Sequence, residues 1–547
     1  MATPVGGFPA ETEGLPEAGE TQAVPLSDGD SFALRVGAVA KRIGGAALRM
    51  LAYNGSVPGP TLLVRQGSTV SVDIENQGDL DTTVHWHGLR LENRFDGTHE
   101  TQAPIPVGGR FTARVAFPDP GIYWYHPHIR QDYGQEMGLS GTVVVEPADP
   151  DYWPPVHREV VLLLDDILLE HDQVAAFAPD EVNYAAMGRF GNVLLVNGRT
   201  DLTLAVARHE VVRLYLANAA NTRVFNIALP GAVMKLVGGD SGRVEREELV
   251  EAVILAPSER AVVDVLFPEA GGYVLEHVTP QRRYAIASVG VSEGSAPAIL
   301  DPPFETLRHN ADLAAERHRV APDLTRAPDK TLSFIAEITM APDDGALGFA
   351  CPMHPDVTSA TPGHCPRCGM KLVSASLVAE TGAHAHEHHG HEHGHGHGHE
   401  HGHGGHDDGA SLPSGIEWED DMVDFNRMTT SANTRWKVVD TITGAANADI
   451  AWSFRVGEQV KVRLLNQMTG DHPMHHPFHI HGAGRFLVLS RDGTPEPNLV
   501  WKDTVLVRTG ETVDILLDVS NPGRWMAHCH IAEHHESGMM FSFDVLP

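Results

Sequence analysis

The sequence predicts an all-β protein with several domains and no membrane-spanning helix, and one observation supports each part of this prediction. Short runs of Val, Ile, Leu, Phe and Thr recur along the chain and are broken by Gly and Pro, which is typical of a β-sandwich or barrel. The length of 547 residues suits about three or four domains of ordinary size. The apolar runs are all too short to span a membrane as a helix.

The charge of the chain narrows the classes of partner, and the placement of its cysteines bears on disulfide bonds. The formal net charge of −32 argues against a nucleic-acid partner and favours cations or neutral substrates. Three of the four cysteines lie close together in the sequence, at Cys351, Cys365 and Cys368, and Cys529 stands alone near the end. This distribution does not indicate a framework of disulfides.

The first 30 residues are acidic and rich in Gly and Pro, so residues 1–30 are expected to form a disordered tail. They contain no apolar core of a signal peptide. Either the protein is cytoplasmic, or the chain is a mature form from which an export signal has been removed.

Residues 31–150 are predicted to form the first β domain, which carries two His-x-His motifs. These are His85-Trp86-His87 and His126-Pro127-His128. Alternate side chains of a strand share a face, so each motif presents two imidazoles to the same side. One such pair could be a surface feature, but two in one domain favour a metal site.

Residues 156–300 have the same β texture and are predicted to form a second domain. It lacks cysteine and His-x-His motifs, and its histidines, such as His209 and His277, are isolated. We therefore expect a spacer and interface domain rather than a metal binder. Residues 301–330 are polar and charged and form the expected connector.

Residues 331–547 are predicted to form a third β domain, which carries two further motifs, at 476–482 and 528–539. In the first, His479 and His481 share a strand face, whereas His476 has the opposite parity. In the second, Cys529 points away from the two histidines that flank it. One Cys, two His and a weak Met are the donors of a blue-copper electron-transfer site.

These four paired-histidine motifs resemble those of the three-domain multicopper oxidases, which include laccases, bilirubin oxidases and bacterial cuprous oxidases. Residues 54–60 and 501–505 also look like family sequence. The resemblance implies three cupredoxin-like Greek-key β-sandwich or barrel domains, O2 as electron acceptor, and one type 1, one type 2 and two type 3 coppers per chain. It also implies a periplasmic or extracellular location, while the missing signal peptide leaves the cytoplasm open.

The resemblance further implies a ligand set for each copper, with the trinuclear cluster between the first and third domains. The type 1 copper would be held by His476, Cys529, His534 and Met539, with Met539 axial. The type 2 copper would be held by His85 and His479. The type 3 pair would be held by His87, His126, His128, His481, His528 and His530. Substrate electrons are expected to enter at an exposed edge of His476 or His534.

Two acidic residues are candidates for proton delivery. Asp96 stands nine residues after the second histidine of the first motif, as does an acidic residue in similar oxidases. A simple turn at residues 95–98 is the alternative, because Asp-Gly is common there. Many relatives place a Glu directly after the second type 1 histidine, but this chain has His535 there, with Glu536 next and Glu533 before the pair. We take Glu536 as the second candidate, although either Glu could serve.

The third domain is interrupted from about residue 343 to 412. Residues 345–378 resemble a small heavy-metal-binding module attached to copper and other metal exporters, with Cys351, His354, Cys365 and Cys368 as an accessory site. These donors suit Cu(I) or zinc, so the identity of the metal stays open and a structural zinc knuckle is the alternative.

Residues 379–412 hold twelve histidines, cannot build a core and should be disordered. They would chelate divalent metals loosely or act as a spacer.

The predicted function is therefore the one-electron oxidation of a reductant, coupled to reduction of O2 to water. Cu(I) is favoured as reductant by the insertion and the acidic charge, while a small aromatic compound such as a phenol is compatible with the motifs. A copper nitrite reductase would need a Cys after the first-domain histidines, and no Cys precedes Cys351. A copper store or carrier is the alternative, but every ligand position of the family is filled.

Overall fold

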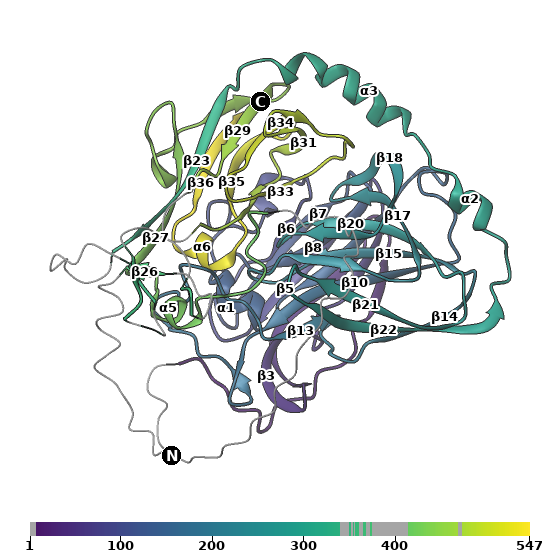
Figure 1. Ribbon diagram of the computed structural model, residues 1–547, viewed down its shortest axis with the longest axis horizontal. Helices are drawn as coiled ribbons and strands as arrows, with labels where there is room; N and C mark the ends of the chain where they lie inside the picture. Colours follow the sequence, from purple (N-terminus) through teal and green to yellow (C-terminus); the bar gives the residue numbers. More distant parts are fainter. Residues whose placement is uncertain are drawn as a thin grey trace.

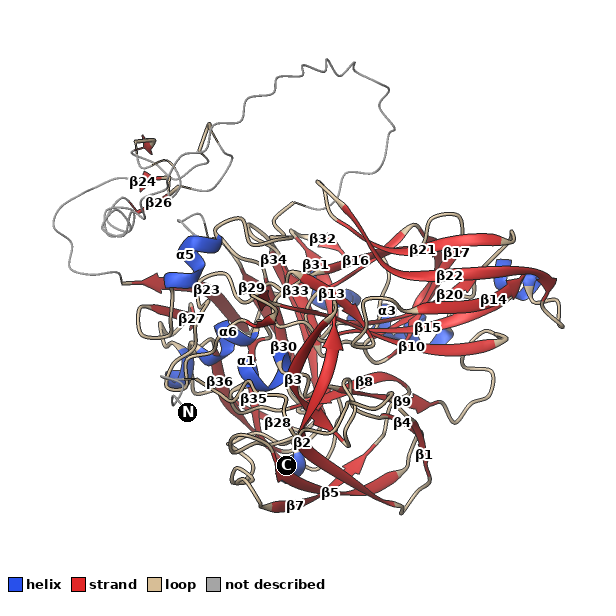
Figure 2. Cartoon of the chain, turned by 90° about the horizontal axis from the view of Figure 1, so that it is seen from below, coloured by secondary structure: helices blue, strands red, loops and turns tan. Residues whose placement is uncertain are grey.

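The predicted fold class is confirmed by the structure, a computed structural model. It describes residues 7–339, 349–351, 354, 356–359, 365–367, 372–374, 414–468 and 473–547. Strands dominate these residues, and each of three successive parts of the chain forms two larger sheets. The second part, in teal, lies to one side of the molecule, and the third, in green to yellow, lies to the other (Figure 1). Helices are short and lie between or outside the sheets (Figure 2).

The first domain encloses its apolar core between a four-stranded and a five-stranded sheet. The first sheet has the order β3 (Ala46–Tyr53), β2 (Ser31–Ile43), β5 (Thr69–Gln77), β7 (Arg110–Ala116). The second has the order β1 (Ala23–Leu26), β4 (Thr61–Arg65), β9 (Gly141–Glu146), β8 (Gly121–His126), β6 (His85–His87). The short helices η1 (Asn93–Phe95) and α1 (Gln131–Glu136) follow β6 and β8 and border the metal site described below.

Strand β1 lies inside the residues that were predicted to be a disordered tail, so that prediction is wrong there. It pairs in parallel with β4, with Ala23 opposite Thr61 and Leu26 opposite Val64. Val24 and Leu26 pack against the first-domain core, and this burial offsets the entropy that ordering costs. Residues 1–6 of the expected tail lie outside the described residues.

The second domain also places an apolar core between two sheets. The six-stranded sheet has the order β13 (Val193–Val196), β10 (Arg158–Ile167), β15 (Val211–Asn218), β20 (Arg260–Leu266), β17 (Val233–Gly239), β18 (Gly242–Val250). The five-stranded sheet has the order β14 (Thr203–Arg208), β22 (Arg283–Ser295), β21 (Gly271–Val278), β16 (Phe225–Ala228), β19 (Ala252–Leu255). A small hairpin pairs β11 (Leu169–Glu170) with β12 (Gln173–Val174).

The expected connector contains α2 (Asp301–Glu305), α3 (Ala311–Val320) and η2 (Ala321–Leu324). On α3, Leu313 and Val320 pack against Leu487 and Leu516 of the third domain. The connector therefore adds apolar contacts to the third domain as well as joining it to the second.

The third domain repeats the two-sheet plan. One sheet has the order β27 (Thr434–Asp440), β23 (Lys330–Ile338), β29 (Gln459–Leu465), β34 (Thr512–Val519), β31 (Gly484–Arg491), β32 (Thr494–Pro495). The other has the order β28 (Ser453–Arg455), β36 (Met540–Leu546), β35 (Gly523–Cys529), β30 (His476–Ile480), β33 (Thr504–Val507). The short helices are α5 (Val423–Met428), η4 (Asn447–Asp449) and α6 (Ala532–Glu536).

The insertion leaves the third domain after β23 and the chain returns before β27. These two strands are antiparallel neighbours, and Ile338 lies opposite Thr434. Within the insertion, β24 (Phe349–Ala350) pairs with both β25 (Thr358–Ser359) and β26 (Val373–Ser374). The predicted histidine tract at 379–412 lies outside the described residues.

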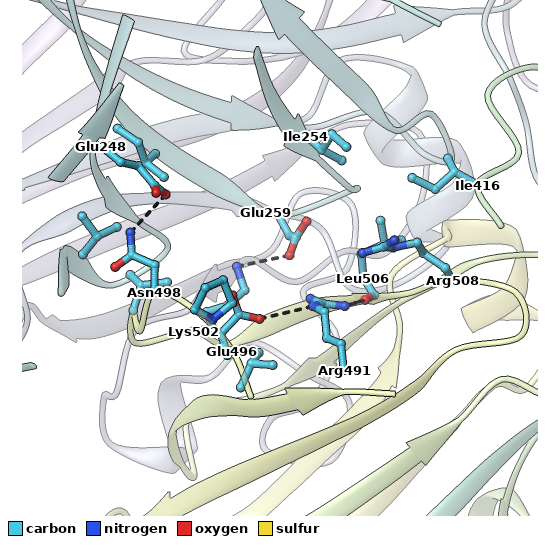
Figure 3. A pocket seen from close by; sticks show the side chains of 15 residues that line it. Glu248, Ile254, Glu259, Ile416, Arg491, Glu496, Asn498, Lys502, Leu506 and Arg508 are labelled. Carbon is cyan, nitrogen blue, oxygen red and sulfur yellow. Dashed lines mark hydrogen bonds and ion pairs between the residues drawn. The ribbon is translucent and has the colours of Figure 1, made fainter. Parts of the chain in front are cut away.

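Charged side chains line a cavity of about 310 Å³ between the second and third domains (Figure 3). There Lys502 lies 3.1 Å from Glu259, and Arg491 lies 3.4 Å from Glu496. The residues that line it include none of the predicted copper ligands. Across the described part of the chain, no helix has the length and apolar character needed to cross a membrane.

Candidate metal centres

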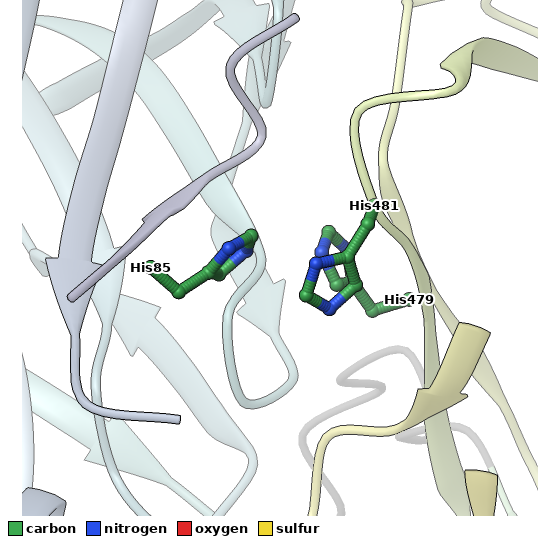
Figure 4. A group of neighbouring side chains, drawn as sticks. All are labelled: His85, His479 and His481. Atoms are coloured by element: carbon green, nitrogen blue, oxygen red, sulfur yellow. The ribbon is translucent and has the colours of Figure 1, made fainter. Parts of the chain in front are cut away.

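Eight histidines of the first and third domains meet in one buried place. Strand pairing sets His85 opposite His126 in the first domain and His479 opposite His528 in the third. Figure 4 shows His85 on one ribbon facing His479 and His481 on another. The eight side chains are at most 2% exposed and belong to His85, His87, His126, His128, His479, His481, His528 and His530. All eight are the predicted type 2 and type 3 ligands.

The eight rings form several groups that could each hold a metal ion. Ligand atoms lie within 4.8 Å of one another in three sets: His85, His479 and His481; His85, His87 and His126; and His128, His481 and His528. The ring of His530 lies 4.9 Å from that of His87 and 5.1 Å from that of His126. The Nε2 atoms of His481 and His528 are 3.0 Å apart. The arrangement can therefore accommodate more than one ion.

In most of these rings one nitrogen is hydrogen-bonded to an oxygen atom, and the other nitrogen is available to a metal, as in metal-ligating histidines. His85 Nδ1 donates to the backbone oxygen of Asp96 at 2.7 Å. His126 Nδ1 donates to the backbone oxygen of Pro127 at 2.9 Å. The Nε2 atoms of both rings are buried and have no hydrogen-bond partner among the described residues. Burying such groups unpaired is costly. Bound metal ions would satisfy them, so the residues present fit copper.

Burial also keeps the imidazoles in the form that binds metal. It lowers the pKa of His126, His128, His479 and His528 well below the usual value, and neighbouring histidines lower it further. Neutral imidazole has a free lone pair near pH 7, which coordination requires.

Asp96 contacts two of the predicted ligands and is more than a turn residue. Its Oδ2 accepts a hydrogen bond from His481 Nδ1 at 2.8 Å, and its Oδ1 lies 3.4 Å from His85 Nδ1. Burial alone would raise the pKa of Asp96, but His481 and His85 outweigh it and lower that pKa. The carboxylate therefore joins a first-domain ligand to a third-domain ligand, while its predicted role in proton delivery stays a prediction.

The predicted type 1 ligands form a second group in the core of the third domain. Cys529 Sγ lies 3.5 Å from His476 Nδ1 and 3.7 Å from His534 Nδ1. Met539 is fully buried in the same apolar cluster as Cys529. Burial raises the pKa of the Cys529 thiol, so a bound metal ion is needed to make it a thiolate near neutral pH. Two imidazoles and one sulfur that converge in this way fit a blue-copper site.

The expected exposed edge of this group is absent from the described structure, and that prediction is wrong. Both His476 and His534 are 0% exposed. The indole of Trp436 stacks on His534 with ring centroids 4.0 Å apart, and its Nε1 donates to the backbone oxygen of Ala185. Residues 182–190, which we call the strap, thus bring a second-domain segment over the site. The sequence contains no local signal of this contact, because the strap comes from another domain.

Asn426 on α5 holds the strap in place. Its Oδ1 accepts from the backbone N–H of Met187 at 3.1 Å, and its Nδ2 donates to the backbone oxygen of Gly188 at 2.8 Å. The neighbouring Thr429 accepts from the backbone N–H of Ala186 at 3.0 Å. Asn426 is 0% exposed, so these hydrogen bonds are shielded from water.

The acidic residues beside the last motif have different surroundings. Glu533 is buried, with Asn221 and Thr222 of the second domain donating to its carboxylate. Burial, aided by Asp132, raises the pKa of Glu533 to about 7. The Glu536 side chain is 18% exposed, and its Oε1 accepts from the backbone N–H of Gln131 at 2.9 Å.

His535 is a ninth buried histidine at the cluster, and its place in the sequence predicted no role for it. It is 3% exposed, and its ring centroid lies 4.6 Å from that of His528 and 4.8 Å from that of His128. Its Nδ1 lies 3.6 Å from Glu536 Oε1. Its departure from the family pattern was the signal, but only the fold shows the contact with two predicted ligands.

Three of the four predicted accessory ligands come together in the insertion. His354 Nδ1 lies 3.8 Å from Cys351 Sγ and 3.6 Å from Cys365 Sγ. Both cysteines are buried and share a small apolar cluster with Leu372. Cys368, the fourth predicted ligand, lies outside the described residues. The three placed donors could hold a soft metal ion.

Comparisons with known proteins agree with this architecture. Residues 38–150 and residues 419–547 match two family models that are both described as multicopper oxidase. Residues 349–375 match a model described as heavy metal binding domain. The two longer matches contain every predicted type 1, type 2 and type 3 ligand, and the short match covers the accessory site.

Individual proteins extend the likeness to nearly the whole chain. The multicopper oxidase MmcO of Mycobacterium tuberculosis is 25% identical over 535 residues, which cover 92% of this chain and 84% of that protein. A solved multi-copper oxidase from Pseudomonas thermotolerans has a TM-score of 0.63 and 23% identity, covering 96% of this chain and all of that one. One from Campylobacter jejuni, titled a metallo-oxidase, has a TM-score of 0.61 and 20% identity, covering 99% of each chain.

Proposed function

Because the chain belongs to the multicopper oxidases, we propose that it oxidises Cu(I) and passes the electrons to O2, which is reduced to water. The observation that carries the proposal is the pair of buried donor groups, one around Cys529 and one built from eight histidines, that meet at strand β35. When bound, four coppers would store four single electrons and so allow O2 to be reduced fully.

The backbone of β35 connects the two groups. His528 and His530 flank Cys529 in the sequence, and successive residues of a strand point to opposite sides. The sulfur therefore faces His476 and His534, while the two flanking imidazoles face the first domain. A covalent path of a few bonds leads from the sulfur to the eight-histidine group.

The buried type 1 group favours a small reductant. A phenol could touch His476 or His534 only if the residues around them moved, because both rings are fully buried and Trp436 packs against each of them. The insertion adds Cys351, His354 and Cys365 to the same domain, and thiolate donors suit Cu(I). A copper store or carrier would not need two donor groups joined through one strand, so the geometry suits electron transfer better.

For proton delivery we propose Asp96 and Glu536. Asp96 is hydrogen-bonded to His481, inside the eight-histidine group. Glu536 borders a cavity of about 360 Å³ together with Arg435 and Ser431. It also contacts His535, whose ring reaches two of the predicted ligands. Glu536 thus lies between that cavity and the cluster.

The test is oxygen uptake by the copper-loaded full chain, measured with Cu(I) and with a phenol, and repeated after residues 343–412 are replaced by a short linker. We expect the excised protein to stay blue and to oxidise phenol as before. Its Cu(I) oxidation should fall mainly at low free copper, because a tethered site raises the local concentration of its ligand.

Full-length protein with Cys351, Cys365 and Cys368 changed to Ser is the matched control for the thiol half of the insertion. A loss equal to that of the excision would assign the effect to the thiols, and a smaller loss would assign the rest to the histidine tract. Unchanged Cu(I) oxidation at every copper concentration after excision would contradict the copper-gathering role. Phenol oxidation without Cu(I) oxidation by the parent would contradict the proposed substrate.

A further inference from the structure

A residue of the middle domain reaches the eight-histidine group. Arg260 is the first residue of β20, and its side chain is 0% exposed. Its five N–H groups donate to backbone oxygens of Ile122, Ser258 and Asp240 and to both carboxylate oxygens of Asp503. The two bonds to Asp503 are each 2.6 Å long. This is the bidentate geometry in which Arg fixes a carboxylate most firmly.

Asp503, in turn, contacts two predicted copper ligands. Its Oδ1 accepts from His87 Nε2 at 3.0 Å, and its backbone oxygen accepts from His479 Nδ1 at 2.9 Å. Thr504 donates to the same Oδ1 at 2.9 Å. The Nε2 of His87 is thereby engaged, and its buried Nδ1 has no partner among the residues that the structure describes. His87 would therefore coordinate through Nδ1, the opposite of His85 and His126.

The glycine that follows the first histidine motif shows how closely this pair is fitted to it. Gly88 has a φ of +84°, and a Cβ there would lie 2.5 Å from Asp503 Oδ2 and 2.7 Å from Arg260 Nη2. Any side chain would displace the ion pair as well as strain the backbone. The Gly in His-Trp-His-Gly thus leaves room for a contact between all three domains.

We propose that Arg260 is a positioning residue of the trinuclear site: by clamping Asp503 it fixes the orientation in which His87 presents Nδ1 to copper. The proposal rests on the copper oxidase function above and assigns to the middle domain a role beyond that of a spacer and interface. Without Arg260, the buried carboxylate would lose its counter-charge and its two fixed bonds. Asp503 could then rotate, and His87 would lose the hydrogen-bond acceptor that fixes the orientation of its ring.

The test compares Arg260→Lys with Arg213→Lys in the copper-loaded full chain. Arg213 is a matched control in the same domain, because it is 2% exposed and binds Asp264 bidentately at 2.8 and 3.0 Å. Its hydrogen bonds reach none of the predicted ligands. The measurements are copper per chain, copper affinity by competition with a chelator, the type 2 electron paramagnetic resonance spectrum, the blue absorption and the melting temperature.

We expect both variants to melt earlier. Arg260→Lys alone should alter the type 2 spectrum, because Asp503 also accepts from the predicted type 2 ligand His479. It should also bind the cluster coppers about 10- to 100-fold more weakly, as loss of an outer-shell partner does. The blue absorption should survive in both. Equal destabilisation with unchanged copper affinity and spectrum in Arg260→Lys would overturn the proposal and leave a purely structural ion pair.

Two further variants keep the test decisive if Arg260→Lys fails to fold. Asp503→Asn keeps the side-chain shape but removes the negative charge that Arg260 binds. Gly88→Ala displaces the Arg260–Asp503 ion pair without changing either residue of that pair. Both should alter the same spectrum, and normal spectra in both would refute the proposal. These measurements do not use turnover, so a parent that fails to oxidise Cu(I) would refute the proposed substrate and leave this comparison intact.

Discussion

Strand parity around Cys529 decides which metal group each residue of the motif serves. Cys529 Sγ approaches His476 and His534, whereas the rings of His528 and His530 contact histidines of the first domain. The two groups therefore share neighbouring residues but no donor atom. A change at the sulfur should affect the first group and spare the second.

Cys529→Ser should abolish the blue colour, because the thiolate gives a type 1 site its strong visible absorption. The serine hydroxyl is a poorer donor for copper in this position. Copper per chain should fall by about one, since the eight histidines are untouched. Absorption spectra and metal analysis of the loaded protein check this. A blue variant would show that another residue provides the sulfur ligand.

Glu136 on α1 makes the stability of the fold depend on pH. Burial raises the pKa of Glu136 to about 8, although Arg189 lies 3.3 Å away. The ordinary value is 4.5, so between pH 4.5 and 8 the unfolded chain has released a proton that the folded chain keeps. The contribution of this group to stability is full below the lower value and is lost as pH rises toward the upper one.

Glu136→Gln cannot ionise in either state and should remove this dependence. The melting temperature of the variant relative to the parent should rise as pH is raised from 5 to 8, with each pH unit worth up to about 1.4 kcal/mol. Thermal melts at a series of pH values measure it. A difference that stays constant across the series would show that Glu136 is ionised in the folded protein.

At the scale of elements, α5 and the strap pack together beside the type 1 group. Asn426 bonds to two strap backbone groups, and Trp436 bonds to a third. This contact joins the second domain to the first helix after the insertion. The cover over His476 and His534 therefore depends on a few polar contacts as well as on apolar packing.

Asn426→Ala should loosen the cover and raise phenol oxidation. It leaves the backbone N–H of Met187 and the oxygen of Gly188 without these partners, at a cost of about 1–3 kcal/mol for each group left unsatisfied. We expect kcat/KM for a phenol to rise several-fold while the melting temperature falls.

Asn76→Ala is the control for this variant, because Asn76 is a 0% exposed first-domain residue whose Nδ2 donates to two backbone oxygens. It should lower stability without increasing phenol oxidation. Equal phenol oxidation by both variants and the parent would mean that electrons reach His534 through Trp436 with the cover closed.

Local patterns in the sequence predicted much of the site, and contacts between domains account for what it missed. Alternation along strands was enough to separate His476 from His479, and the family resemblance of the four motifs implied the set of eight cluster histidines that the structure brings together. The strap over the type 1 group and the clamp of Arg260 on Asp503 join residues far apart in the sequence. Such contacts have no periodic signature in the sequence. The predicted exposed type 1 edge was therefore wrong, and the predicted spacer role of the second domain was incomplete.

At the scale of the molecule, the cluster ties the two ends of the chain together. The first domain provides four of the eight histidines and the third domain provides the other four, and Asp96 joins His85 to His481 across the boundary. The second domain contributes polar contacts to both. Metal bound at this boundary stabilises the folded state, because it binds that state in preference to the unfolded chain.

Removing copper with a chelator should therefore lower the melting temperature of the first and third domains more than that of the second. Differential scanning calorimetry of the loaded and metal-free protein should show one transition move down and another stay in place. Reloading with copper should restore it. A uniform shift of all transitions would mean that the three domains unfold as one unit.

The pairing of β23 with β27 has a consequence for protein engineering. Since Ile338 and Thr434 lie opposite each other, the insertion at residues 343–412 lies within the connection of a very long hairpin. Doubling the length of a flexible turn costs only about 0.6 kcal/mol in closure entropy. Small domains that recognise other ligands could therefore replace residues 343–412 at little cost to the two sheets of the third domain, with α5 left in place. The resulting proteins would be oxygen-consuming sensors of those ligands.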